Sequence, residues 1–479
     1  MRRAGLALVG LALVMSGCLG ASNTVQPNAL PGLALLTPAA EPLWVNPQTT
    51  PHPLFNFPTL SNPATGVNVP AWWAPIAAKE LPSPITGLEP LAATHDEVPS
   101  GGGMSVFGSL AVVPGYGNPT SILDITDPAA PKLLSTIEEE NHRNVDFIAF
   151  PTGRLIAVFA TGNGTIPVWD ITDPAHPVRI SEFQPTAGTH KINVVPGTPI
   201  VYNANSNGGG CPIPDPSGGL ACFMVGSRFA DQGTGITEIY DLSDPEHPLL
   251  VQDWQNGFGC HHIYFWINPA VEKYRALCAG IEFTQIWDIA DPRNPEVIVS
   301  VPMQHGNTAL PSTHLGIESF SHFSILNYAG DTLIVGDESG GGGLPPGCVA
   351  HASTPLGDVS TPVGALWFYD VSDESNPQLK GWFSPGYPLN NLPPAGAGAV
   401  FGNSCTAHHG RLVPDPSGRE LLAMAFYRAG VVLVDFTDPA APWLVDQWND
   451  GTDTWEVQYY NGYLFTGDLA RGMDVLSLT

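Results

Sequence analysis

The stretch "LDITDPAAP" at residues 123–131 has five further close copies along the chain, and this repetition decides the fold. Each copy reads as the end of one strand, a tight turn and the start of another strand. In the turn, the Asp carboxylate can accept backbone N–H groups and the proline fixes its own φ angle. The other copies are "WDITDPAHP" from Trp169, "YDLSDPEHP" from Tyr240, "WDIADPRNP" from Trp287, "YDVSDESNP" from Tyr369 and "VDFTDPAAP" from Val434, followed by a truncated "MDVLSL" from Met473.

Two more short apolar strands precede each copy, as in "VDFIAF" and "LIAVFAT" ahead of Trp169. Four strands per unit, repeated seven times, predict an all-β chain folded as a seven-bladed β-propeller with four-stranded antiparallel blades. The last copy stops after its third strand, whereas "SPITGLEPLA" at residues 83–92 has the pattern of a fourth. We therefore expect the ring to be closed by a strand from the N-terminal side, which removes an exposed sheet edge.

These copies resemble the repeats of the LVIVD-repeat family, bacterial exported and surface proteins whose repeats end in "VxDVSDPxxP". The resemblance covers roughly residues 94–479 and implies a β-propeller. The family is largely uncharacterised, and a propeller carries no single activity, so the resemblance implies no particular reaction.

The first 18 residues have the pattern of an export signal. Arg2 and Arg3 form a basic region, and Ala4 to Met15 form an apolar stretch too short to span a bilayer. Small residues then lead into Cys18, as in the bacterial lipoprotein signal, which this ending resembles; an ordinary cleaved signal is the alternative. We expect Cys18 to carry lipid and to anchor the chain in the bacterial cell envelope, facing the periplasm or the exterior.

The organisation that follows is a Pro-rich tether over residues 19–82 and the propeller over residues 83–479. Lys and Arg total 17 against 44 Asp and Glu, so the formal charge is −27. Such a chain repels phosphate backbones, and we expect no nucleic-acid partner. The expected contacts are the membrane, through the anchor alone, and an unidentified protein or small-molecule ligand.

Six cysteines remain besides Cys18, and an even number after export indicates disulfides. Proximity favours two pairs, one within a single loop and one across neighbouring strands, and the third pair follows from what is left. The predicted pairs are Cys211–Cys222, Cys260–Cys278 and Cys348–Cys405.

Histidines recur at the start of the first strand of the predicted unit. This strand is the innermost one of a blade, so its start lies near the axis at one mouth of the central channel. We expect a ring of imidazoles there, whereas strand alternation turns the adjacent His261 and His408 away into the packing. The ring positions are His142, His190, His262, His322 and His409, with His95 as the candidate in the first blade and Trp455-Glu456 in the last.

Four long insertions are predicted at the same end of the propeller. Two join the second and third strands of a blade, at residues 207–223 and 340–354, and two join successive blades, at residues 302–320 and 384–405. The Asp-Pro turns at the opposite end stay short. Functional residues on repeat scaffolds tend to lie where the loops are elaborated.

The ends of the second strands add charged residues at the same mouth. Glu338 is a candidate ligand beside the histidines, and the other residues are candidates for orienting the imidazoles or for proton transfer. These others are Glu282, Asp337, Arg428, Asp468 and Arg471.

Two readings of the imidazole ring remain open. Several imidazoles with a carboxylate can bind one Zn, Cu or Fe ion, with His262, His322 and His409 as the strongest candidates and His142, His190 and Glu338 beside them. Alternatively, histidine recurs because the repeat recurs, and each ring only pins its blade at the axis. The function expected first is a cell-surface binding module that uses its His-rich, loop-elaborated face. The alternative is a metal-dependent enzyme, such as an oxidoreductase, with an ion held on the axis by histidines.

Overall fold

The computed structural model describes residues 72, 76–115, 117–139, 141–150, 152–162, 164–186, 188–205, 236–255, 260–268, 271–280, 283–302, 321–338, 353–354, 357–358, 364–385 and 405–479. The signal, Cys18, most of the tether and most of the four predicted insertions lie outside these residues. In the part of the chain so described, no helix is both long and apolar enough to cross a membrane.

Strands follow one another in seven antiparallel four-stranded sheets, each a blade. The first four blades, in chain order from the axis outward, comprise β2 (Ser105–Phe107), β3 (Leu110–Val113), β4 (Thr120–Asp124) and β5 (Lys132–Ile137); β6 (His142–Ala149), β7 (Leu155–Thr161), β8 (Ile166–Asp170) and β9 (Val178–Phe183); β10 (Lys191–Val194), β11 (Ile200–Ala204), β12 (Ile236–Asp241) and β13 (Leu249–Gln255); and β14 (His262–Asn268), β15 (Lys273–Ala279), β16 (Phe283–Asp288) and β17 (Glu296–Pro302).

The other three blades complete the circle. They comprise β18 (Ser321–Leu326), β19 (Thr332–Asp337), β22 (Leu366–Asp370) and β23 (Gln378–Phe383); β24 (Gly410–Pro414), β25 (Glu420–Ala425), β26 (Val431–Asp435) and β27 (Trp443–Trp448); and β28 (Thr454–Tyr460), β29 (Tyr463–Asp468), β30 (Gly472–Leu478) and β1 (Leu88–Ala93). A two-stranded pair, β20 (Ser353–Thr354) with β21 (Gly357–Asp358), lies between β19 and β22 in the chain.

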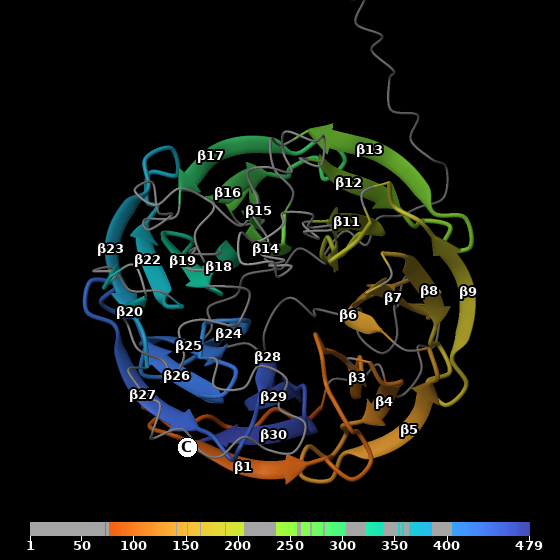
Figure 1. Ribbon diagram of the computed structural model, residues 1–479, viewed down its shortest axis with the longest axis horizontal. Helices are drawn as coiled ribbons and strands as arrows, with labels where there is room; N and C mark the ends of the chain where they lie inside the picture. The colour runs from red at the N-terminus through yellow and green to blue at the C-terminus, as the bar shows by residue number, and fades with distance from the viewer. Residues whose placement is uncertain are drawn as a thin grey trace, which may run out of the picture. The chain divides into compact units, whose positions relative to one another are not determined.

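The predicted fold is confirmed: the sheets surround a central axis as a seven-bladed β-propeller (Figure 1). Innermost strands such as β6, β14, β18 and β28 lie nearest the centre, and β5, β9, β13 and β17 form the rim. In chain order the predicted insertions come after β11, β17, β19 and β23, and most of their residues lie outside the described ones.

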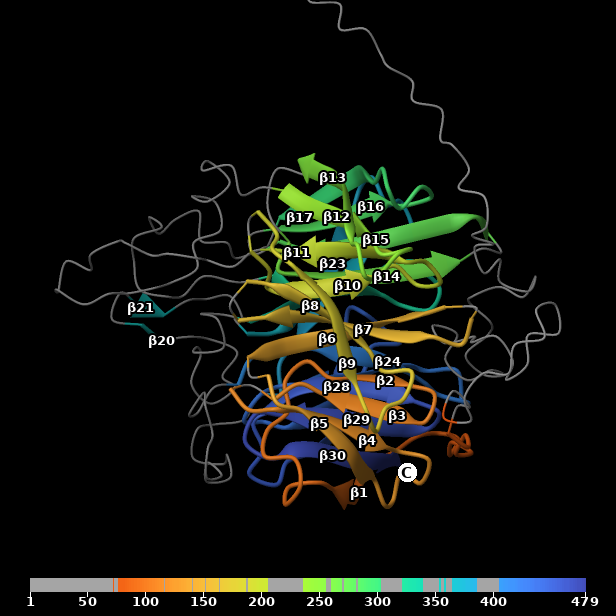
Figure 2. The ribbon, with the colours of Figure 1, turned by 90° about the vertical axis from the view of Figure 1, so that its right-hand side faces the viewer.

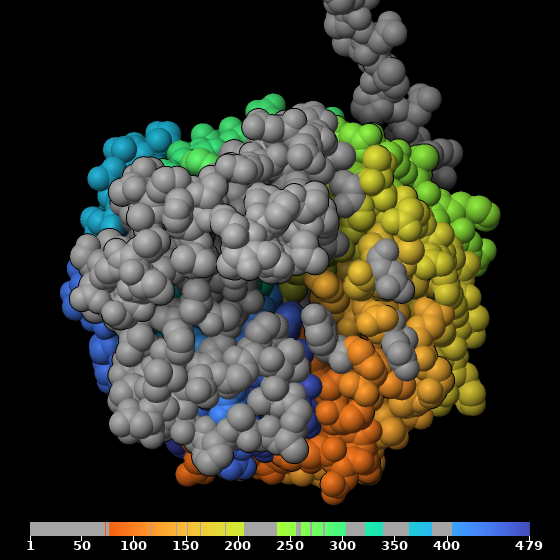
Figure 3. All heavy atoms as spheres, in the orientation of Figure 1, coloured from red at the N-terminus to blue at the C-terminus, as the bar shows by residue number. Residues whose placement is uncertain are grey.

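The ring is closed by a strand from the N-terminal side, as predicted. β1 pairs antiparallel with β30, with Leu88 opposite Leu478 and Ala93 opposite Asp474. β1 lies alongside β30 in both ribbon views (Figures 1 and 2), and the blue atoms of the last blade adjoin the orange atoms of the first in Figure 3. Trp72 and Ile76, which precede β1, also pack against buried clusters of the propeller.

The repeated Asp-Pro turn works as its sequence suggests. In "WDITDPAHP", Asp170 Oδ1 accepts the backbone N–H of Thr172 at 2.9 Å, and Asp173 Oδ1 accepts that of Ala175 at 3.1 Å. Both bonds recur in the other five full copies, and the residue after the first Asp is buried in each. The repeat therefore fixes both the turn and one core position of every blade.

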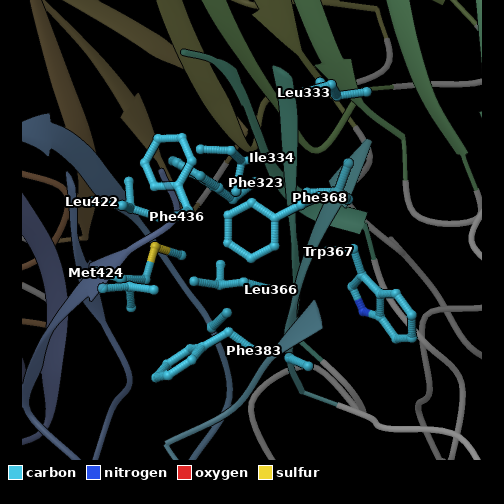
Figure 4. Packing of buried hydrophobic residues seen from close by; sticks show 14 of the residues in the cluster. Phe323, Leu333, Ile334, Leu366, Trp367, Phe368, Phe383, Leu422, Met424 and Phe436 are labelled. Atoms are coloured by element: carbon cyan, nitrogen blue, oxygen red, sulfur yellow. The ribbon is translucent and has the colours of Figure 1, made fainter. Parts of the chain in front are cut away.

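The core lies between neighbouring blades rather than within one. Between the fifth and sixth blades, Phe368 and Phe436 stack with ring centroids 5.5 Å apart, and Phe323 and Met424 pack beside them (Figure 4). Hydrogen bonds at the rim join consecutive blades as well, since Ser135 Oγ donates to the carbonyl of Pro174 at 2.6 Å. These contacts hold the start of each innermost strand at a fixed place around the axis.

Deleting residues 1–93 is expected to destabilise the protein strongly, because it removes β1 together with the buried Ile76, Ile85 and Leu88. At roughly 2 kcal/mol or more for each buried aliphatic side chain, the free energy of unfolding should fall by about 6 kcal/mol or more. Urea unfolding monitored by tryptophan fluorescence measures the change. The matched control begins at Trp72 and keeps β1; equal stability of the two variants would show that β1 does not close the ring.

Candidate metal centre

Among the residues that the structure describes, six histidines gather at one mouth of the channel, where the innermost strands of the third to sixth blades begin. We call them the His cluster: His190, His261, His262, His322, His408 and His409. All except His190 are buried. Neighbouring rings lie close, with centroids 3.9 Å apart for His190 and His261, 4.4 Å for His261 and His322, and 4.2 Å for His322 and His408. Side chains far apart in sequence thus form one continuous imidazole surface.

Two overlapping groups within this cluster have the geometry to hold a metal ion. His322, His408 and His409 form one, and His261, His322 and Glu338 form the other; in each, one ligand atom per residue lies within 4.8 Å of the others. All five residues are buried. His322 belongs to both groups, so the two overlap at this residue.

Backbone carbonyls orient two of the imidazoles toward Glu338. His408 Nδ1 donates to the carbonyl of Trp455, and His322 Nδ1 donates to the carbonyl of His408 at 3.2 Å. A neutral imidazole that donates through Nδ1 keeps a lone pair on Nε2. These Nε2 atoms lie 3.6 Å and 3.5 Å from the two carboxyl oxygens of Glu338. Such carbonyl partners are the usual second contact of metal-binding histidines.

Tyr427 fixes the carboxyl group of Glu338 from the other side. Its hydroxyl donates to Oε1 of Glu338, and its ring packs against His408 with centroids 4.9 Å apart. The backbone of Tyr427 has φ of 44°, a left-handed conformation that a bulky residue rarely adopts. Hydrogen bonds in both directions with the backbone of Thr454 hold it there. Strain at this position is thus maintained by the adjoining blade.

His409 differs from the other members of the centre, because both of its nitrogens are engaged. Lys191 Nζ donates to Nε2, and Nδ1 lies 3.1 Å from the hydroxyl of Tyr264 and 3.2 Å from Nδ1 of His262. An ammonium group can only donate, so Nε2 accepts and Nδ1 carries the proton. The lone pair of His409 is therefore already occupied by Lys191.

Two cations and one carboxylate complete the polar surroundings. Glu456, in β28, lies 3.8 Å from Lys191 Nζ and 3.4 Å from Arg411 Nη1. Arg411 also donates to the hydroxyl of Tyr264 at 3.1 Å and lies over its ring. The last blade therefore contributes Glu456 to the mouth in place of an imidazole.

Burial sets the protonation states at this mouth. It is the largest cause that holds the pKa of His261, His262, His322, His408 and His409 well below the usual value, and nearby Lys191 adds to it in each case. Burial also raises the pKa of Glu338 to about 8, against the hydrogen bond from Tyr427 and the charge of Lys191. The imidazoles are neutral at pH 7, the form in which histidine binds metals.

The structure brings together only part of the predicted ring. His322, His409 and Glu338 lie in the candidate centre, and His190 and His262 lie directly beside it. His142 lies apart: it stacks on Phe159 with centroids 4.3 Å apart and its Nδ1 lies 2.8 Å from the hydroxyl of Thr120. It belongs to neither candidate group.

The first blade contributes glycine rather than histidine at the axis. His95 follows β1 on the outside of the last blade, where its Nε2 lies 2.8 Å from Asp474, so the prediction that it takes the ring position is wrong. Gly101, Gly102 and Gly103 instead precede β2, and a Cβ on Gly101 would lie 2.4 Å from the carbonyl oxygen of Gly472. The close approach of these backbones leaves no room for an imidazole.

The prediction that His261 and His408 face away from the axis is also wrong. Both precede the paired residues of β14 and β24, where strand alternation no longer applies. In the fifth blade, the register shifts between Ser321 and Phe323, so His322 is the extra residue of a bulge. A bulge turns successive side chains off the regular two-residue pattern. The available signal was the pair of doublets "CHH" and "AHH", in which a second histidine stands beside the repeated one.

Most of the charged residues predicted at the ends of the second strands form hydrogen bonds with backbone groups. Asp337 Oδ2 accepts the N–H of Gly364 at 2.8 Å, and Asp468 Oδ2 accepts that of Asp453 at 2.6 Å. Arg428 donates to the carbonyl of Thr452 at 3.1 Å, and Arg471 pairs with Asp474 at 3.4 Å. None of them belongs to a candidate metal group among the described residues, and Glu282 lies outside those residues.

One predicted disulfide is present at the site. Cys260 and Cys278 are joined, which ties the residue before His261 to β15. Cys260 is therefore not a thiolate ligand for a metal. Cys405 is also disulfide-bonded, but Cys211, Cys222 and Cys348 lie outside the described residues, so the other two pairings stay predictions.

Two solved structures are similar to this chain at low sequence identity. No protein-family profile and no curated protein matches the sequence. Among solved structures, the chain is similar to the β-propeller domain of Cps50 (Swd1) from Myceliophteria thermophila, with a TM-score of 0.48 and 12% identity over 82% of this chain and 100% of that one. It is also similar to Sqt1 from Saccharomyces cerevisiae, with a TM-score of 0.44 and 11% identity over 82% and 83%.

Replacing both Cys260 and Cys278 by alanine should lower the free energy of unfolding by about 3 kcal/mol, because the bond closes a short loop in the unfolded chain. Urea unfolding of the oxidised proteins measures the difference, and reduced samples provide the control, since the difference should shrink there. Equal stability of the oxidised proteins would show that the bond does not constrain the His261 segment.

Proposed function

We propose that the protein is a metal-dependent enzyme whose transition-metal ion is held by His261, His322, His408 and Glu338. The observation that carries this proposal is Nε2 of His408. It is buried, has no hydrogen-bond partner among the described residues, and lies 3.6 Å from the carboxyl group of Glu338. A buried polar atom without a partner costs free energy, and an ion between the imidazole and the carboxylate offsets that cost.

The donor set limits which ions fit. Three neutral imidazoles and a carboxylate suit Zn, Cu and Fe, whereas Ca and Mg prefer oxygen ligands alone. A bound cation would also stabilise the ionised form of Glu338, whose pKa burial otherwise raises. The neutral imidazoles need release no proton to bind the ion.

Several features favour a reacting ion over a purely structural one. Four protein ligands leave at least one coordination position open on a five- or six-coordinate iron or copper ion. The centre lies at the end of the propeller from which the four long connections leave. Tyr427 and Trp455 pack directly on His408. An oxidoreductase is the reaction class that this combination supports best, with the ion as the redox partner.

A cell-surface binding module is the second candidate. The propeller fold is consistent with it, and the observation in its favour is that all four long connections leave the same end of the ring. In this proposal the lipid anchor at Cys18 and the resemblance to the LVIVD-repeat family place the module at the cell envelope. The His cluster then lies at the base of the surface that binds the ligand.

Protein purified without chelator and incubated with Zn, Cu or Fe is expected to retain about one ion per chain after desalting. His322→Ala and His408→Ala should each lose it, because each removes an imidazole nitrogen from the centre. Elemental analysis by plasma mass spectrometry measures the content. His176→Ala is the matched control, since His176 is 82% exposed and pairs only with Asp173.

Two results would contradict the metal proposal. If wild type retains no ion, or if both cluster variants retain as much as wild type while circular dichroism shows a native fold, the metal proposal fails. The binding-module candidate would then remain.

A further inference from the structure

We infer that Lys191 binds a small anionic ligand, of the carboxylate class, that occupies the open coordination position of the metal. This inference rests on the proposed function and names the chemical class of the substrate at that same site. It depends on the surroundings of Lys191, because binding of the metal by its ligands gives no reason for a buried lysine at this position.

Lys191 is a buried lysine with few partners. Its side chain is 3% exposed, and the other described lysines that form ion pairs, Lys273 and Lys380, are 43% and 39% exposed. An ammonium group has three N–H donors. Among the described residues, one donates to Nε2 of His409, and Glu456, 3.8 Å from Nζ, is the partner of a second. At least one buried donor is therefore available to a ligand.

Three cationic side chains lie on one side of the cluster. Glu456 is shared between Lys191 and Arg411, and Gln458 donates to one of its oxygens at 3.0 Å. Arg143, whose Nη1 donates to His190 at 2.9 Å, adds a third cation on the same side of the cluster. Lys191 is more buried than Arg411, with side chains 3% and 18% exposed, and the carboxylates Glu456, Asp146 and Glu338 lie near these cations. A negative ligand would add a partner for the ammonium group of Lys191.

Position connects this cationic side to the metal. Lys191 is one imidazole away from the centre, because the ring of His409 lies 4.5 Å from His322 and 4.1 Å from His408. Its hydrogen bond also keeps the lone pair of His409 off the ion. The ammonium group of Lys191 therefore keeps one imidazole from the ion and contacts the ring that borders the candidate ligands. A carboxylate has two oxygens, one for the ion and one for the ammonium group.

Charge-assisted hydrogen bonds of this kind are stronger than neutral ones, and a metal–ammonium pair recognises carboxylates better than neutral molecules. The ligand class is thus a small organic carboxylate. Azide shares the negative charge but is linear and has no oxygen atoms, so comparing it with acetate separates charge from the two-oxygen geometry.

The test uses full-length protein loaded with Co(II), whose visible spectrum reports on its ligands. Acetate and azide are titrated separately into wild type, Lys191→Met and Lys191→Arg, with Lys380→Met as the control at an exposed lysine. We expect Lys191→Met to bind acetate at least tenfold more weakly than wild type, with unchanged cobalt content. Lys191→Arg should keep most of the affinity, and azide should be affected less than acetate.

Each of the other outcomes would overturn the inference about Lys191. Equal acetate affinity in wild type and Lys191→Met would overturn the inference and leave the metal centre standing. Loss of cobalt from Lys191→Met would instead make Lys191 a support of the ligands and also overturn it. Equal losses for acetate and azide would reduce the class to any small anion and reject a carboxylate-specific site. Absence of cobalt from wild type would reject the metal proposal and the inference together.

Discussion

The hydrogen-bonded ladder between β1 and β30 is the constraint on which the rest depends. It joins the two ends of a chain of repeats, each of which buries its apolar faces only against its neighbours. Once the ring is closed, every innermost strand has to begin at the same end and near the same axis. Imidazoles that are more than 200 positions apart in sequence, such as His190 and His409, then belong to one cluster.

The cluster is costly to build without a ligand. Five imidazoles, one lysine and two glutamates are buried together, and burial shifts the pKa of each in the direction that disfavours its charged form. Carbonyl groups hold Nδ1 of His322 and His408 so that both Nε2 atoms point at Glu338. Repeat inheritance explains equivalent positions in successive blades, but it does not explain His261 or His408, which are second histidines added beside the repeated one. A metal centre accounts for both.

The fold could be predicted from the sequence because the signal is periodic. Asp170, Pro174 and their counterparts recur at fixed positions. A turn whose own Asp side chains accept its backbone N–H groups forms without contacts to distant parts of the chain. The closing strand was also predictable, since a truncated final repeat leaves an edge that another strand has to cover. The sequence predicted that the site lies at one mouth of the channel, but not which residues form it.

The membership of the centre was not predictable, for two physical reasons. Strand alternation assigned His261 and His408 to the packing, but these residues precede the ladders, and a bulge displaces His322. Glu456 holds the repeat position predicted for the last blade, but Lys191 and Tyr427 share no sequence pattern, because they meet the other residues of the site only through the closure of the ring. His142 kept its repeat position and still lies elsewhere, since Phe159 and Thr120 hold its ring.

X-ray absorption spectroscopy of the metal-loaded protein tests the central claim most directly. At the absorption edge of the bound ion, the account predicts a first shell of three imidazole nitrogens and carboxylate oxygen, with no sulfur. His409→Ala should preserve that shell, whereas His408→Ala should lose one imidazole. A shell that contains sulfur, or one that loses an imidazole in His409→Ala but not in His408→Ala, would contradict it.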